Sequence, residues 1–272
     1  MTQPPFIPDL DDVRRAQFVI GAYTCTRLEI IGARPGNPMG AESRRFGEAV
    51  ALRAPGSSMP HFNRGYGFCD EQIEHIPALI DWYAAGAGGS FELAPGRPAV
   101  EMARLLSAAG YRLGGFHATF VGPTDLPDAP PSPNVDVRRV AGEGDLQVFA
   151  DAYHLGWAIT GFRIPMLPWL AAPGWTLYLA HCDGQPAGAA ILYVNGEDAY
   201  LADSAVDPRF RHHGVHRALL DRRCDHARAA GASRIYSGAD FLSASSRNMQ
   251  RKGLKLLYTE AILTGPQPKA AG

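Results

Sequence analysis

The spacing of apolar and polar positions in the second half of the chain predicts short strands interleaved with helices. Leu146, Phe149 and Tyr153 recur at helical spacing, for example, whereas the segments around them alternate as strands do. The predicted strands are 135–140, 175–182, 187–194, 200–206 and 234–238, and the predicted helices are 145–155, 217–230 and 243–252. Asp183-Gly184 and Asn195-Gly196 are typical hairpin dipeptides, so the three strands that they separate are expected to be antiparallel.

The first half of the chain shows the same alternation. It predicts strands at 62–68, 91–93 and 115–121, and helices at 71–85 and 100–109. The glycines in 86–89 end a predicted helix and lead into a strand. A dinucleotide-binding loop has the opposite order, so we interpret these glycines as a turn.

A proline-rich stretch separates the two halves. Five prolines fall within 122–133, where they remove backbone donors and hold the chain extended. We therefore predict a first domain at 1–122, a linker at 123–133 and a second domain at 134–272.

The composition adds limits to this picture. The chain has 272 residues, of which 46% are hydrophobic and 19% charged, which is typical of a folded protein with about two domains. A net charge of -1 argues against bulk nucleic-acid binding. The sequence contains no apolar run long enough to span a membrane, no basic and apolar leader, and four isolated cysteines, which predicts a cytoplasmic protein with reduced thiols.

The strongest chemical signal follows the predicted strand 200–206. The segment from Asp207 to His216 forms a basic, glycine-containing turn that opens the helix 217–230. Backbone N–H groups at a helix N-terminus favour an anion, and Gly214 would let the backbone approach it closely. Arg209 and Arg211 add positive charge, so the turn suits a pyrophosphate.

Two motifs in the second half resemble those of one family. Arg211-x-x-Gly214-x-His216 resembles the Arg/Gln-x-x-Gly-x-Gly/Ala coenzyme A signature of GNAT acyltransferases, from which it departs at His216. Downstream, Ser245-x-Arg247-Asn248-x-x-Arg251-x-Gly253-Leu254 resembles a late motif of many bacterial members. Both motifs occur in the family's order, and the resemblance covers 135–264.

This resemblance implies an α/β protein with two GNAT-like domains, each a mixed, mostly antiparallel sheet flanked by helices. The first domain would be a degenerate partner that packs against the second and walls the acceptor pocket, or else an unrelated α/β cap. The implied cosubstrate is acetyl-CoA, and its implied contacts are Ala205, Val206, Arg211, His212, His213, Gly214, Val215, His216, Ser245 and Asn248.

The family mechanism implies attack of a neutral amine on the thioester. As base we expect Asp203 first and Asp240 second, although each carboxylate could equally be solvated or cap a turn. Where many members place a proton-donating tyrosine, this sequence has Met249. Water, Ser245, Tyr258 or direct release of the thiolate remain alternatives.

The expected acceptor is a primary amine on a small molecule, with aminoglycoside antibiotics as one class and proteins or peptides as a rival. An acyl-CoA sensor with weak catalysis is the alternative outside enzymes. We expect a monomer or homodimer that binds neither nucleic acid nor membrane.

Two further features have competing interpretations. His212 and His216 have the spacing of helical zinc ligands, but His213 stands where a metalloprotease has its glutamate, so no metal is predicted. Aromatic residues flank the loop 157–173 and are interpreted as core, with stacking on an acceptor as the alternative: Trp157, Phe162, Trp169 and Trp175.

Overall fold

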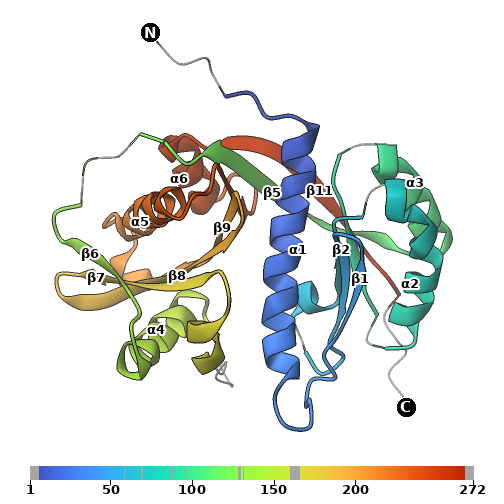
Figure 1. Cartoon of the computed structure of the whole chain (residues 1–272), viewed down its shortest axis with the longest axis horizontal. Helices are drawn as coiled ribbons and strands as arrows, with labels where there is room; N and C mark the ends of the chain where they lie inside the picture. Colours follow the sequence, from blue (N-terminus) through green and yellow to red (C-terminus); the bar gives the residue numbers. More distant parts are fainter. Residues whose placement is uncertain are drawn as a thin grey trace. The chain divides into compact units, whose positions relative to one another are not determined.

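The computed structural model describes residues 6–57, 59–68, 70–86, 88–95, 97–127, 130, 132–159 and 166–266 (Figure 1). The chain divides into two compact units. The C-terminal unit consists of Phe120–Leu256 with Met1–Pro8, and the N-terminal unit consists of Asp9–Thr119 with Leu257–Gly272. Two strands, β5 (Arg112–Pro123) and β11 (Lys255–Thr264), contribute residues to both units.

The C-terminal unit is an α/β domain whose strands lie in the order β5-β10-β9-β8-β7-β6. Strands β6 to β9 are antiparallel neighbours, and β10 runs parallel to β9. The strands are β6 (Val135–Arg139), β7 (Trp175–Cys182), β8 (Gln185–Asn195), β9 (Asp198–Val206) and β10 (Arg234–Ala239). The helices are α4 (Glu143–Gly156), η3 (Leu167–Ala171), η4 (Pro208–Phe210), α5 (Val215–Ala229) and α6 (Ala244–Lys252).

The predicted elements of this half are confirmed, with ends that shift by about two residues. Asp183 and Gly184, which join β7 to β8, both have positive φ, as a tight hairpin turn requires, and Gly196 has φ 61 between β8 and β9. Helix α4 covers one face of the sheet, and α5 and α6 cover the other (Figure 1). The buried face of α5 carries the apolar residues that its sequence spaced at helical intervals.

The N-terminal unit has the strand order β1-β2-β3-β4-β11-β5. Its elements are α1 (Leu10–Gly32), β1 (Glu42–Phe46), β2 (Ala49–Arg53), η1 (Pro60–Phe62), β3 (Arg64–Tyr66), η2 (Asp70–His75), α2 (Ile76–Ala84), β4 (Ser90–Leu93) and α3 (Arg97–Ala108), with parts of β5 and β11. The helix predicted at 71–85 is in fact two segments. Pro77 stands in the first turn of α2, where its fixed φ suits a helix start, and the preceding turn is a 3₁₀ helix.

Among the α-helices and strands, four were not predicted from the pattern: α1, β1, β2 and β11. The buried positions of α1 include the polar residues Asp12, Gln17, Thr24 and Arg27. The buried face of this helix is therefore not recognisable as an apolar stripe in the sequence. The division into units also differs from the expected one at the C-terminus, because 257–272 group with the N-terminal unit and not with 134–256.

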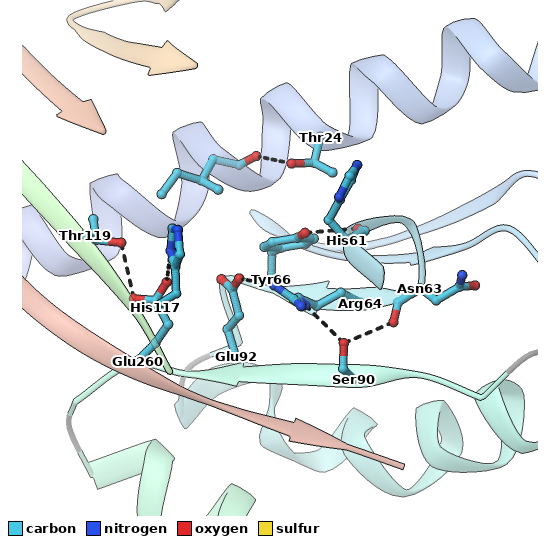
Figure 2. Close-up of polar contacts among 11 residues, drawn as sticks. Thr24, His61, Asn63, Arg64, Tyr66, Ser90, Glu92, His117, Thr119 and Glu260 are labelled. Atoms are coloured by element: carbon cyan, nitrogen blue, oxygen red, sulfur yellow. Dashed lines mark hydrogen bonds and ion pairs between the residues drawn. The ribbon is translucent and has the colours of Figure 1, made fainter. Parts of the chain in front are cut away.

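A buried polar network crosses the sheet of the N-terminal unit (Figure 2). Arg64 pairs with Glu92 at 2.8 Å, while Glu260 accepts from Thr119 at 3.2 Å and lies 2.9 Å from His117 Nδ1. Burial, together with the negative charge of Glu260, raises the pKa of Glu92 to about 7. The folded unit therefore holds a proton on this carboxyl under conditions in which the unfolded chain loses it.

This raised pKa predicts a pH-dependent stability. Glu92 binds its proton more tightly in the folded state, so its contribution to the free energy of unfolding falls as the pH rises from 4.5 to about 7. Glu92→Gln, which cannot ionise, should flatten that part of the stability curve in urea unfolding. Glu48→Gln, at an exposed carboxylate, is the control and should follow the wild type. Equal slopes for Glu92→Gln and the wild type would contradict the prediction.

Candidate functional site

The turn between β9 and α5 is braced by a buried carboxylate. Asp207 is 2% exposed and accepts from the Arg209 backbone N–H at 2.9 Å. The Arg209 guanidinium also pairs with it at 2.6 Å, and these hydrogen bonds lower the pKa of Asp207. The charge of Arg209 is thus balanced by Asp207, although both Arg209 and Arg211 are exposed, and Arg211 has no ion pair among the described residues.

The N-terminus of α5 is open. His212 and Gly214 have φ of 69 and 83, and no side chain among the described residues caps the helix. The first helical hydrogen bond runs from Ala218 N to Gly214 O at 3.0 Å, so the N–H groups of 215–217 lie outside the helical ladder. These donors and the positive end of the helix dipole form an anion-binding arrangement.

Gly214 is required by its surroundings as well as by its φ. A Cβ at this position would overlap the hydroxyl of Ser132, a residue of the proline-rich linker. Ser132 in turn accepts a hydrogen bond from Arg217 Nη2 at 2.7 Å. Ser132 therefore lies against the turn, a contact that the sequence pattern did not predict.

His216 links the two motifs. Its Nε2 lies 3.2 Å from Ser245 Oγ and its Nδ1 lies 3.3 Å from Asn248 Nδ2, so residues of α5 and α6 meet here. Burial, with a smaller effect from Arg223, lowers the pKa of His216 to about 4. When the Asn248 amide donates to Nδ1 of this neutral ring, Nε2–H donates to Ser245.

The other predicted contact residues occupy three kinds of position. Ala205 is buried and Val206 half-buried at the end of β9, where Gly156 of α4 packs so closely that a Cβ would come within 2.9 Å of Val206 N. Val215 is buried, so only its main chain faces the turn. Arg211, His212 and His213 are exposed.

Strand β9 has a bulge beside this turn. Ala189 pairs with Ala205 and Ile191 with Ala202, so Ala190 of β8 faces two residues of β9, Asp203 and Ser204. Asp203 has φ 39, and its Oδ2 accepts from the Tyr153 hydroxyl at 2.9 Å. The buried Ser204 hydroxyl has no hydrogen-bond partner among the described residues.

The bulge lies where β9 and β10 separate. Their parallel pairing runs from Asp198–Arg234 to Tyr200–Tyr236, after which the Ser237 hydroxyl donates to Leu201 O at 2.9 Å. Asp240 follows β10 directly and is exposed. Since parallel strands end at the same edge of a sheet, the structure brings both predicted base candidates to one edge.

Three side chains around the bulge were missed: Tyr153, Ser204 and Arg223. The buried guanidinium of Arg223 donates to carbonyl oxygens of β8 and β9. The sequence held one signal for it, because Arg223 falls on the helix face that also carries Leu220 and Ala227. A charge on an apolar face is unusual unless it is paired or hydrogen-bonded.

The histidine pair and the aromatic residues each had two interpretations. His212 lies in the turn before α5, so His212 and His216 do not form an i, i+4 helical pair, and the described residues hold no group of three potential metal ligands. Trp169 and Trp175 are buried, whereas Trp157 is half-exposed. Phe162 lies outside the described residues. No helix in the described part of the chain has the length and apolarity to cross a membrane.

Comparison with known proteins agrees with this geometry. A family model described as "Acetyltransferase (GNAT) family" matches residues 146–253, which contain the turn and both motifs except Leu254. A comparison with curated sequences found no match. The match to this family model lies in the C-terminal unit, and the fold of that unit resembles that of GNAT acetyltransferase domains.

Solved structures share the fold over nearly the whole chain. A GCN5-related N-acetyltransferase from Kribbella flavida has a TM-score of 0.61 at 17% identity and covers 93% of this chain and 98% of its own. One from Sphaerobacter thermophilus has a TM-score of 0.55 at 16% identity, covering 93% and 94%. A tandem GNAT protein from the clavulanic acid biosynthesis pathway has a TM-score of 0.54 at 11% identity, covering 96% and 98%.

The lowered pKa of His216 predicts how stability responds to acid. The folded protein keeps this ring neutral while the unfolded chain protonates it, so stability is present above pH 6.5 and is lost as the pH falls toward 4. His216→Gln, which retains hydrogen-bonding groups, should lose less stability over this interval in urea unfolding. His213→Gln, at an exposed imidazole, should track the wild type. An acid response of His216→Gln that matches the wild type would be inconsistent with a neutral buried ring.

Proposed function

We propose that this protein is an N-acetyltransferase that moves an acetyl group from acetyl-CoA to a primary amine of a small molecule. The observation that carries the proposal is the open N-terminus of α5, preceded by a glycine turn and adjacent to the bulged strand β9. The first feature suits a pyrophosphate and the second suits an acyl carbonyl.

The residues present fit acetyl-CoA. Gly214 keeps the turn free of a side chain, and the N–H groups of 215–217 and Arg211 supply positive potential. Ser245 and Asn248 lie near the same helix end because both contact His216. The buried hydroxyl of Ser204, which has no hydrogen-bond partner in the described part of the chain, favours the bulge as a place for a polar ligand atom. Bound acetyl-CoA would supply the thioester as the acyl donor.

Two proton transfers would use groups of this chain, one from the amine and one to the departing sulfur. Asp203, oriented by the Tyr153 hydroxyl, is the proposed base or attractor for the amine, with Asp240 at the same edge as the second candidate. The buried Met249 cannot donate a proton. In the tautomer of His216 whose Nε2–H donates to Ser245, the Ser245 hydroxyl keeps its own proton for another acceptor, so Ser245 is the proposed donor to the departing sulfur.

The acceptor is proposed from the same surroundings. Asp203 suits a cationic amine, and the half-exposed Trp157, with its ring 6.4 Å from that of Tyr153, suits a sugar or aromatic ring. Aminoglycosides combine both features and are one proposed class, with a protein or peptide N-terminus as the rival. We propose a cytoplasmic location for the reaction.

We propose that the N-terminal unit is a degenerate GNAT-like domain. Its helix α2 begins with Pro77 in the first turn, which lacks an N–H group, whereas α5 offers free donors at this point. The linker would hold Ser132 against the anion-binding turn.

Binding of the acyl donor tests the placement of the site. Acetyl-CoA should raise the Tm of the wild type, and Gly214→Glu should abolish the rise because its carboxylate repels phosphate and displaces Ser132. Gly231→Glu is the matched control, since Gly231 also has positive φ but nothing within 4 Å of a Cβ. A normal Tm rise in Gly214→Glu would refute this placement.

Turnover separates the enzyme from its alternative. Release of free thiol from acetyl-CoA should appear with at least one member of a panel of amines that includes aminoglycosides and peptides. Tight binding without thiol release from any of them would instead indicate an acyl-CoA sensor, which Met249 at the tyrosine position favours.

The role of Asp203 predicts a pH-dependent defect. Asp203→Asn should lower kcat/KM about a hundredfold at neutral pH, and much of the loss should return at high pH, where the free amine is abundant. Asparagine tolerates positive φ, so this variant preserves the backbone at the bulge. Tyr153→Phe should show a smaller loss of the same kind. An unchanged kcat/KM in Asp203→Asn at every pH would move the assignment to Asp240 or to water.

A further inference from the structure

Arg223 is a buried cation at the centre of the C-terminal unit. It lies on α5 and is 1% exposed. Its Nε donates to Leu219 O at 2.9 Å, one turn earlier on the same helix. Its Nη1 donates to Ile191 O at 3.1 Å and to Ala202 O at 3.0 Å. One nitrogen of α5 therefore holds two neighbouring strands.

The two strand carbonyls mark the edge of the bulge. Ile191 and Ala202 are register partners, and the register shifts immediately after them. The next residue of β9 is Asp203, with its positive φ. The guanidinium thus holds the last regular pair of the β8–β9 ladder before the extra residue of β9.

The burial of this cation is costly. Desolvation lowers the pKa of Arg223 to about 10, although the nearby charge of Asp203 opposes the change. Buried charges are weak contributors to stability, and an apolar residue would fill the same space at lower cost. A role in geometry accounts better for an arginine here than a role in stability does.

Helix α5 carries this residue and the anion-binding turn together. Gly214 and Arg223 are nine residues apart, roughly 14 Å along a helix. A rigid helix anchored to the bulge at one point fixes the distance from its N-terminus to that bulge. Lysine has no planar fork and would not reproduce the same set of bonds.

We propose that Arg223 is a positioning residue that holds the β9 bulge at a fixed distance from the anion-binding turn before α5. With the pyrophosphate of acetyl-CoA bound at that turn, the acetyl carbonyl would then lie at the bulge. The proposal rests on the proposed function. Arg223 acts through the backbone of Ile191 and Ala202 and does not touch the reacting atoms.

The test compares ligands that use different parts of the site. Binding of adenosine 3′-phosphate 5′-diphosphate, CoA and acetyl-CoA is measured by calorimetry for the wild type, Arg223→Lys, Arg223→Met and the control Arg222→Gln. Arg222 is the exposed neighbour on the same helix. Thiol release gives kcat and KM for the same proteins. If Arg223→Met does not fold, Arg223→Lys alone serves as the test variant.

The expected result is a selective loss. The wild type should bind acetyl-CoA more tightly than CoA. The Arg223 variants should bind the nucleotide half within about twofold of the wild type but lose this difference, and kcat should fall about a hundredfold with a smaller change in KM. Arg222→Gln should behave as the wild type. Equal weakening of all three ligands, or no change in any, would overturn the positioning role. Failure of the wild type to bind acetyl-CoA would overturn the proposed function, and with it this inference.

Discussion

One extra residue in β9, between Ala202 and Ala205, interrupts the ladder with β8 and forces Asp203 into a positive φ. Three neighbours hold this irregularity: Tyr153 donates to the Asp203 carboxylate, Gly156 packs against the strand end, and Arg223 holds the last regular pair. Each comes from a helix on the sheet. Helices α4 and α5 therefore stabilise the strained part of β9 in addition to packing on the sheet.

Most of the C-terminal unit could be predicted from the sequence because its signals are local. Asp183-Gly184 fixes a hairpin by its own backbone preferences, and the turn before α5 is encoded within ten residues. In the N-terminal unit the pattern was weaker. Buried polar residues such as Arg27 interrupt the apolar face of α1, and the buried Glu260 does the same in β11. Polar networks satisfied by distant partners are invisible to periodicity.

The sequence predicted individual residues of the candidate site but not the contacts between them. The sequence placed Gly214, Ser245 and Asn248 in two motifs, but that His216 joins them through both ring nitrogens depends on how α5 and α6 pack. Arg209 was expected to add positive charge to the turn, and the sequence did not show that Asp207 pairs with it. The bulge had no sequence signal, since Asp203 and Ser204 fit a regular strand equally well and only the pairing with Ala190 shows the extra residue.

Strand β11 is synthesised long after the strand of the N-terminal unit with which it pairs. Within the N-terminal unit, Ala261 of β11 pairs with Leu93 of β4, roughly 170 residues earlier in the sequence. On the ribosome, β4 emerges long before β11 is made, and the edge of β4 stays unpaired until roughly 170 further residues have been added. The first unit to be translated is thus the last to be completed, and a nascent chain that stalls within β10 would expose this edge to other strands.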